Sequence, residues 1–203
     1  MEAMEAIKIK ENTLIPESEF SISLDRKKII ESEFIDKINL SPHKNLQFFL
    51  KKSYIDSKKL PQEFHEAIYK FKNNENRKGI LLFKNLPLDS YIPFTPKDPL
   101  NIPEKSSFLS EKWIAAVAEN LGHAISYKQE KNGQLIQNLI PVKENEDKLS
   151  SESSKIILDF HTEVAFHPQK TDYVILLCLR QDHNKEAETF ISSAKEIRSQ
   201  LSK

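Results

Sequence analysis

One short stretch, from Leu158 to Arg180, constrains this chain more than any other. The apolar and β-branched residues that precede it, beginning at Ile156, predict a strand, and His161 and Glu163 follow at its end. Because residues i and i+2 of a strand point to the same side, the imidazole and the carboxylate are expected to project together. Two such groups can take neighbouring positions around one metal ion, which makes two-thirds of a 2-His-1-carboxylate facial triad.

The His-x-Glu spacing is weak evidence by itself. With six His and 30 Asp plus Glu among 203 residues, about one His-x-Asp/Glu is expected by chance. His161 is the one histidine with an acidic residue two positions on. The alternative, a strand-end histidine beside a surface glutamate, stays open on spacing alone.

The residues around this motif resemble one enzyme family. His-Thr-Glu-Val-Ala-Phe-His-Pro, followed by Asp-Tyr-Val-Ile-Leu-Leu-Cys-Leu-Arg, is similar to the clavaminate synthase-like branch of the Fe(II)/2-oxoglutarate-dependent oxygenases, which includes hydroxylases of free arginine and asparagine. Gly79 to Pro87 resembles the early core strand of that branch, and segments 127–133 and 137–141 resemble its hairpin before the motif. The resemblance covers about residues 60 to 200.

The resemblance implies an α+β fold with an incomplete double-stranded β-helix (jelly roll) core flanked by N-terminal helices. It implies an enzyme that holds Fe(II) through His161 and Glu163 and uses 2-oxoglutarate to hydroxylate a free amino acid or a similar small molecule. Thr189 aligns with a threonine that hydrogen-bonds 2-oxoglutarate, with an ordinary strand threonine as an equal alternative. Gln129 and Glu130 align with residues that hold the substrate head group, although a solvated hairpin edge is the simpler alternative.

The sequence departs from this family at its C-terminal end. Family members carry the third iron ligand, a His, and an Arg that pairs with 2-oxoglutarate well beyond the His-x-Glu, whereas only forty residues follow Glu163 here. Neither the distal His nor that Arg is expected in this sequence. Three alternatives follow: a second chain supplies the missing C-terminal half, the chain is a truncated non-catalytic remnant, or it is an interaction module that retains the fold without the chemistry.

Length and composition bound the remaining possibilities. A chain of 203 residues suits one domain, and 30 basic and 30 acidic residues give no net charge that would favour nucleic acid or an anionic membrane. The N-terminus is acidic where a signal peptide needs basic residues, and the apolar run Tyr173 to Leu179 is far shorter than the ~20 residues of a membrane-spanning helix. Cys178, the single cysteine, is expected to be buried in the fold. A single cysteine cannot form a disulfide within the chain, which suits a reducing compartment. A cytoplasmic protein with small-molecule or protein partners is therefore predicted.

Helical patterns dominate the first half of the chain. Residues 1–60 are expected to form a helical or extended extension, and residues 61–203 the N-terminal portion of the oxygenase domain. Apolar spacing predicts a helix through Ile29, Ile30, Phe34, Ile35 and Ile38, and another from Leu46. A helix from Pro61 should pack its apolar stripe on the sheet, the stripe being Phe64, Ala67, Ile68 and Phe71. A further helix is expected to be capped by Ser110 and ended by Gly122, with Trp113, Ile114, Val117 and Leu121 as its packed face.

Strand and loop patterns dominate the second half. Strands are predicted at Ile80 to Phe83, at Ala124 to Tyr127 and Leu135 to Ile140 around an Asn-Gly turn, at Tyr173 to Arg180 as a buried strand, and at Thr189 to Ile191. Five prolines within 87–103 predict a long ordered loop that either rims a site or merely connects elements. Residues 143–155 are expected to be a mobile loop, and His167, Asp182 and His183 to be surface or turn residues. A capping box of Ser193 and Glu196 begins a last helix.

Overall fold

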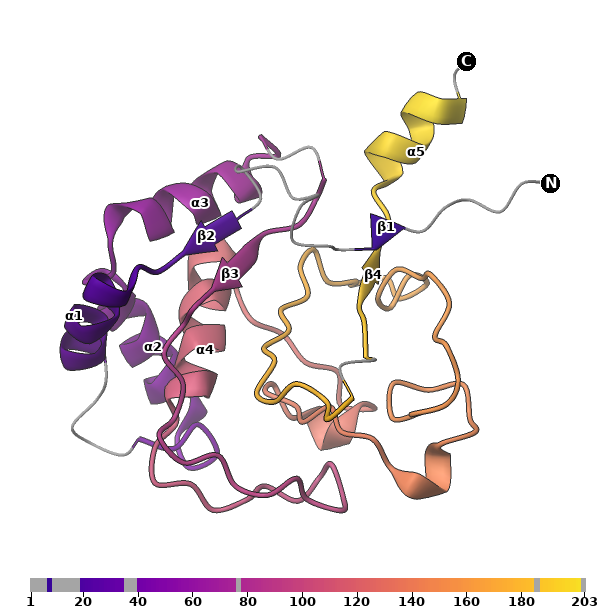
Figure 1. Cartoon of the computed structure of the whole chain (residues 1–203), viewed down its shortest axis with the longest axis horizontal. Helices are drawn as coiled ribbons and strands as arrows, with labels where there is room; N and C mark the ends of the chain where they lie inside the picture. The colour runs from indigo at the N-terminus through magenta and orange to yellow at the C-terminus, as the bar shows by residue number, and fades with distance from the viewer. Residues whose placement is uncertain (1–6, 9–18, 35–39, 76–77, 185–186, 202–203) are drawn as a thin grey trace.

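The computed structural model describes residues 7–8, 19–34, 40–75, 78–184 and 187–201, which form helices, short strands and long irregular segments (Figure 1). The four longer helices lie together in one half of the molecule, and segments 122–190 make up most of the other half. None of the described helices is long and apolar enough to cross a membrane. The elements are β1 (Ile7–Lys8), β2 (Glu19–Ser21), α1 (Leu24–Phe34), α2 (Leu46–Ser57), α3 (Gln62–Lys72), β3 (Leu82–Lys84), α4 (Leu109–Leu121), β4 (Phe190–Ile191) and α5 (Ala194–Leu201).

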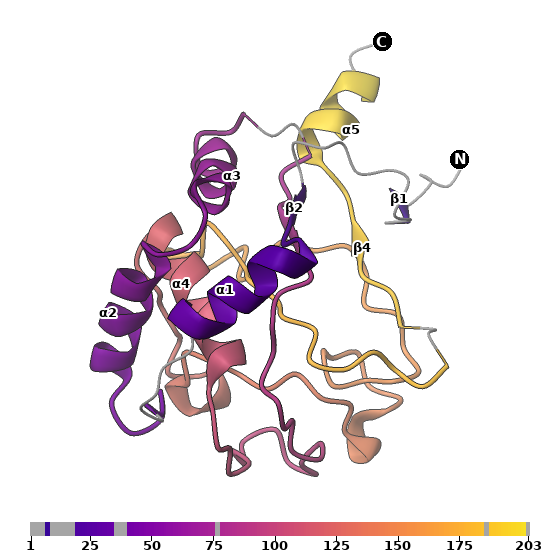
Figure 2. The same ribbon diagram turned by 60° about the vertical axis from the view of Figure 1, so that its left-hand side comes forward.

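The main core gathers around α4, with α1, α2 and α3 beside it (Figure 2). Trp113 of α4 is almost fully buried, and its ring lies 4.5 Å from that of Phe34 and 6.2 Å from that of Phe64. The predicted stripe of the third helix is confirmed, since Phe64 and Ile68 are buried while Ala67 and Phe71 pack against the same core. Residues before and after 61 therefore share one core.

A parallel pair of strands, β2 and β3, lies against α3. Phe20 is opposite Phe83 in the register, and both rings contact Phe64 at 5.8 and 5.6 Å between centroids. The strand predicted at Ile80 to Phe83 is confirmed as β3, which begins two residues later and ends one residue later. The expected packing of the helix on the sheet is confirmed as well. The partner strand at Glu19–Ser21 was not predicted, because three residues carry no periodic pattern of their own.

The other helices follow the sequence patterns. The helix from Leu46 is α2, and the helix that Gly122 ends is α4. Ser193 begins α5 by accepting a hydrogen bond from the Glu196 amide at 3.5 Å. The first predicted helix is found as α1, although Ile35 and Ile38 lie outside the described residues.

Several predicted strands are not found. Between β3 and β4 the described residues contain no strand, so the expected hairpin strands, the lead-in at Ile156 and the strand at Tyr173 to Arg180 are wrong as assigned. The Asn-Gly turn itself is confirmed, because Asn132 and Gly133 both have left-handed backbone angles, with φ of 57° and 74°. In the described part of the chain these segments form no hydrogen-bonded pairing with another strand, and a strand is defined by such pairing.

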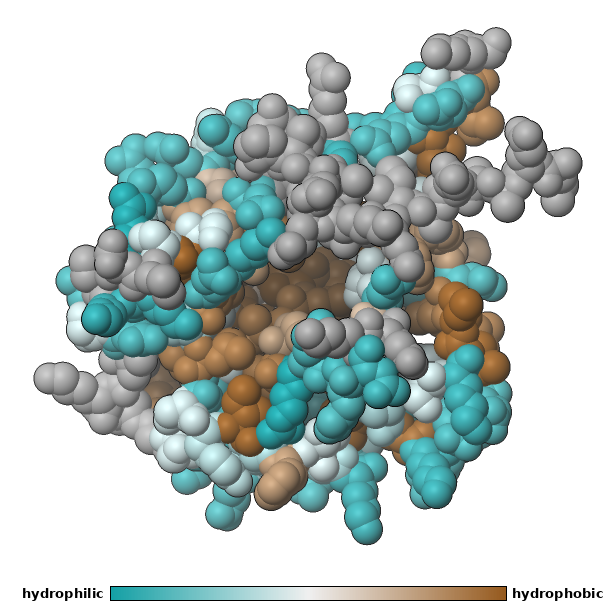
Figure 3. Space-filling model, viewed as in Figure 1, coloured by the Kyte–Doolittle hydropathy of each residue, from teal (hydrophilic) through white to brown (hydrophobic). Residues whose placement is uncertain are grey.

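The segment from Tyr173 to Cys178 illustrates the difference. Tyr173 and Ile175 pack against the main core, whereas Val174 and Leu176 are 55% and 63% exposed. The prediction that this segment is buried is therefore wrong for one of its two faces. Cys178, expected to be buried, is exposed because it lies on the solvent face of the same alternation. Apolar atoms also gather in a hollow at the middle of the face seen in Figure 3.

Candidate metal centre and adjoining cleft

His161 and Glu163 are brought together on an exposed turn. Nε2 of His161 lies 3.2 Å from a carboxylate oxygen of Glu163, and the two side chains are 48% and 52% exposed. Nδ1 of His161 donates to the backbone carbonyl of Asp159 at 2.7 Å, because a carbonyl can only accept. This hydrogen bond, and then the Glu163 carboxylate, raise the pKa of His161 above its usual value.

This geometry suits two neighbouring ligands of one metal ion. Two donor atoms about 2.1 Å from a metal and at right angles to each other are about 3 Å apart, close to the observed 3.2 Å. Ligating histidines commonly donate their other ring N–H to a carbonyl or a carboxylate, as His161 does to Asp159. A metal ion would lie between Nε2 of His161 and the Glu163 carboxylate. In the part of the chain that the structure describes, no group of three or more His, Cys, Asp or Glu residues completes such a site.

The backbone directly after this pair is strained. Val164 has a φ of 46°, in the left-handed region that β-branched residues rarely adopt. A turn follows, in which the amide of His167 donates to the Val164 carbonyl at 2.9 Å. His167 is exposed, as expected, and its ring lies 4.7 Å from that of Tyr127, whose hydroxyl donates to the Gln169 carbonyl at 2.6 Å. Through these contacts, the turn that follows His161 and Glu163 packs against the segment that leads from Tyr127 to Gln129.

A cleft of about 410 Å³ lies beside that segment. Gln129 lines it, together with the tip of the proline-rich loop at Lys97 to Leu100 and the carboxylate of Glu152. An ion pair with Lys131 holds the pKa of Glu152 below its usual range. The tip of the proline-rich loop therefore lines this cleft, and its role as the rim of a functional site stays a prediction. Segment 143–155 begins with a short 3-10 helix, Lys143–Asn145, and otherwise forms a loop, whose mobility stays a prediction. The Val142 amide donates to the Glu152 carbonyl at 2.9 Å and holds the two ends of this segment together.

The remaining predicted site residues are not brought into this cleft. Glu130 follows Gln129 on the same turn, is exposed and does not line the cleft. Thr189 is exposed and comes directly before β4. Asp182 is a turn residue as expected, because its carboxylate accepts from the Asn184 amide at 2.8 Å.

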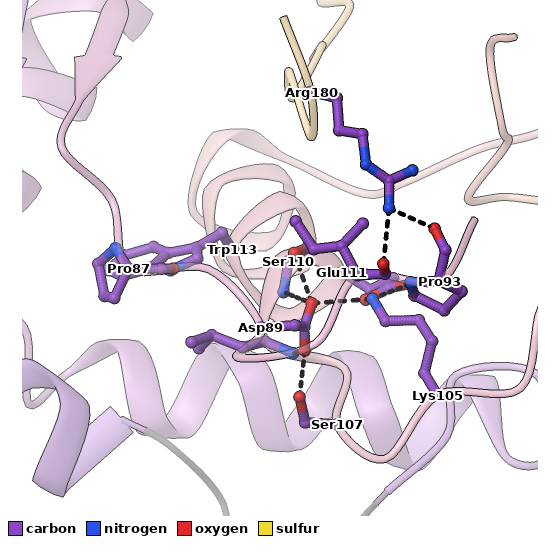
Figure 4. A network of polar contacts seen from close by, with 11 residues as sticks. Pro87, Asp89, Pro93, Lys105, Ser107, Ser110, Glu111, Trp113 and Arg180 are labelled. Carbon is purple, nitrogen blue, oxygen red and sulfur yellow. Dashed lines mark hydrogen bonds and ion pairs between the residues drawn. The ribbon is translucent and has the colours of Figure 1, made fainter. Parts of the chain in front are cut away.

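A buried carboxylate, Asp89, was missed by the sequence analysis (Figure 4). It caps α4 from a distance by accepting from the backbone amides of Leu109 and Ser110 at 2.8 and 3.1 Å. The predicted cap, Ser110, instead lies inside the helix and donates its hydroxyl to Asp89. Burial alone would raise the pKa of Asp89, but hydrogen bonds from a lysine, two hydroxyls and an amide outweigh it and lower the pKa from 3.8 to about 2. No local signal could have found this cap, because it is twenty residues from the helix it serves.

Solved structures share the architecture of this chain. The crystal structure of asparagine oxygenase matches with a TM-score of 0.72 at 24% identity, covering 83% of this chain and 53% of that one. The non-heme iron oxygenase OrfP in complex with Fe and alpha-ketoglutaric acid matches with a TM-score of 0.60 at 19% identity, covering 74% and 48%. The described residues thus share the fold of part of a non-haem iron oxygenase.

Two curated proteins are similar to this chain in sequence. Clavaminate synthase 2 from Streptomyces clavuligerus is 31% identical over 155 residues, which is 76% of this chain and 47% of that protein. Enduracididine beta-hydroxylase from Streptomyces hygroscopicus is 33% identical over 141 residues, covering 68% and 41%. No family model matches the chain. The chain is thus related to the clavaminate synthase-like Fe(II)/2-oxoglutarate-dependent oxygenases, as its motif indicates, and spans about half the length of the curated relatives it matches.

Proposed function

We propose that this chain is part of an Fe(II)/2-oxoglutarate-dependent oxygenase that hydroxylates a free amino acid or a similar small molecule. The observation that carries the proposal is the pair of His161 and Glu163, whose donor atoms lie 3.2 Å apart on one turn. Relatives named L-lysine 3-hydroxylase and L-asparagine oxygenase support an amino-acid substrate. When bound, Fe(II) and 2-oxoglutarate would together activate dioxygen, which is the oxidant and the source of the oxygen atom for hydroxylating an unactivated carbon.

The residues of this chain hold and orient the reacting groups. His161 and Glu163 each supply one ligand to the metal, and the Asp159 carbonyl keeps the imidazole in the required tautomer. Gln129 in the cleft suits the head group of an amino acid, because an amide can donate to a carboxylate and accept from an ammonium. Glu130 as a second head-group contact and Thr189 as a contact to 2-oxoglutarate stay predictions.

Two ligands bind a divalent metal more weakly than three, so the site needs a further donor. We infer that the third ligand, a 2-oxoglutarate-binding arginine and the remaining jelly-roll strands come from polypeptide outside the described residues, such as a second chain. The extended segment from Tyr173 to Cys178 supports this inference, because a second layer packed on its solvent face would cover Val174 and Leu176.

An anaerobic titration with Fe(II) and then 2-oxoglutarate tests the proposal. Chelation of both is expected to give a visible charge-transfer band, in the chain alone or when the completing polypeptide is added. Glu163→Gln should abolish the band, while His167→Ala, an exposed histidine on the same turn, should leave it unchanged. A folded, completed complex that gives no band and no amino-acid-dependent turnover of 2-oxoglutarate would contradict the proposal.

A second candidate function is an interaction module that retains the fold without the chemistry. The observation that favours it is the half-exposed state of both ligands, with no third ligand among the described residues. Such a module should melt cooperatively at a temperature that Fe(II) and 2-oxoglutarate do not change. Stabilisation by Fe(II) that disappears in His161→Ala would exclude it.

A further inference from the structure

The proline-rich loop that rims the cleft is closed at its base by a buried ion pair. Nζ of Lys105 lies 2.8 Å from the carboxylate of Asp89, and the two side chains are only 8% and 0% exposed. The same lysine contacts Glu111 of α4 at 2.7 Å. Both ends of the loop are therefore fixed to the N-terminal turn of α4, while the fifteen residues between them extend toward the cleft.

A second fastening holds the middle of this loop, and it comes from a segment far along the chain (Figure 4). One terminal nitrogen of Arg180 donates to the backbone carbonyls of Ile92 and Pro93, each at 2.6 Å. The other lies 3.4 Å from the hydroxyl of Thr95. A guanidinium donates along fixed directions and always carries its charge, so these contacts define where the loop lies more sharply than a flexible lysine would.

The part of the loop that Arg180 holds leads directly into the cleft wall. Lys97 to Leu100 line the cleft, and their own turn is fixed by Asp98, whose carboxylate accepts from the Leu100 amide at 2.8 Å. Pro93 and Pro96 restrict the backbone angles between the carbonyls that Arg180 contacts and this turn. A displacement at Ile92 is therefore carried to the tip rather than absorbed on the way.

We propose that Arg180 is a positioning residue that sets this wall of the cleft. It ends the extended segment that follows the His161 motif, so the segment packed beside the core and the rim of the cleft are held in one arrangement. The wall presents the ammonium of Lys97 and the carboxylate of Asp98, a pair of charges that complements a zwitterionic amino acid. The ligand class rests on the proposed function, whereas the role of Arg180 in placing the loop does not.

Hydrogen exchange of the whole chain tests the placement directly. In Arg180→Met, the amides of Leu100 and Asn101 are expected to exchange at least tenfold faster, while amides of α4 and the melting temperature stay as in the wild type. Arg180→Lys should recover part of this protection. Arg26→Met is the matched control, since Arg26 is a half-exposed arginine paired with Glu63 at 2.8 Å away from the loop. Unchanged exchange at Leu100 and Asn101, or equal acceleration throughout the chain, would overturn the proposal.

Calorimetric titration with L-arginine and L-asparagine adds a functional measurement. If either amino acid binds the wild type, Arg180→Met should raise its dissociation constant at least fivefold and the Arg26 control should not. If neither binds any variant even with the completing polypeptide present, the amino-acid substrate is contradicted for this chain, and the exchange data still decide the role of Arg180.

Discussion

Asp89→Asn should be the most informative single change to the helical half of this protein. The Asp89 side chain is fully buried and caps α4, the helix around which the core packs. Asparagine keeps the shape and one acceptor oxygen. It removes the charge that Lys105 contacts at 2.8 Å and turns an NH₂ group toward donors that need an acceptor.

The expected loss can be worked from the pKa of Asp89. Holding that pKa at about 2 against a usual 3.8 corresponds to about 2.5 kcal/mol of folding free energy, at about 1.4 kcal/mol for each factor of ten. The misdirected NH₂ group adds about 1 kcal/mol. The sum of about 3.5 kcal/mol would lower the melting temperature by roughly 7 to 14 °C in a chain of this size.

Urea denaturation at several pH values checks both the magnitude and its origin. Because the pKa of Asp89 is lower in the folded than in the unfolded chain, its contribution is complete above about pH 4 and is lost as the pH falls through about 2. The gap between wild type and variant should therefore be widest near neutral pH and shrink in acid. Asp147→Asn, at a side chain that is 71% exposed, should change stability by less than about 0.5 kcal/mol. A loss below about 1 kcal/mol, or a gap that does not narrow in acid, would refute the reasoning.

Three further predictions concern the core and the candidate metal centre. Lys112→Met should lower the free energy of unfolding by about 2 to 4 kcal/mol in urea denaturation, because buried Asp56 loses the buried ammonium of Lys112, now at 2.7 Å, and keeps contacts to the more exposed Lys52 and Lys59. Adding Asp56→Leu should recover at least half of the loss. His161→Ala and Glu163→Gln should leave the melting temperature within about 2 °C, since both side chains are half exposed, yet weaken Co(II) binding at least tenfold by calorimetry. Trp113→Phe should cost about 1 to 2 kcal/mol in thermal denaturation, because it removes a buried 2.8 Å hydrogen bond to a backbone carbonyl of the loop.

The elements predicted correctly from the sequence are those whose signal is local. The apolar spacing around Phe64 and Trp113 determines a helical face within a dozen residues, so α3 and α4 could be placed without knowing what they pack against. The cap of α4 could not be predicted, because Ser110 fits the local pattern of a cap, whereas Asp89 caps the helix through contacts made across about twenty residues. Arg180 was visible as the last residue of the motif, but its acceptors are backbone carbonyls more than eighty residues earlier, which no sequence pattern marks.

The candidate site shows the same limit in a different form. The pairing of His161 with Glu163 needs only the i, i+2 relation, which an extended turn preserves even where no strand is formed. The strands expected around it depend on partner backbone, and the described residues provide none for the segment from Tyr173 to Cys178. That segment already alternates between a face on the core and a face in solvent, as a strand in a sheet would. Arg180 lies two residues beyond this segment, so polypeptide that paired with the segment would fix the arginine and, through the carbonyl of Ile92, the wall of the cleft. We therefore expect completion of the sheet to be coupled to the shape of the proposed binding site, so that the exchange rate of the loop and the binding of metal respond together to a completing partner.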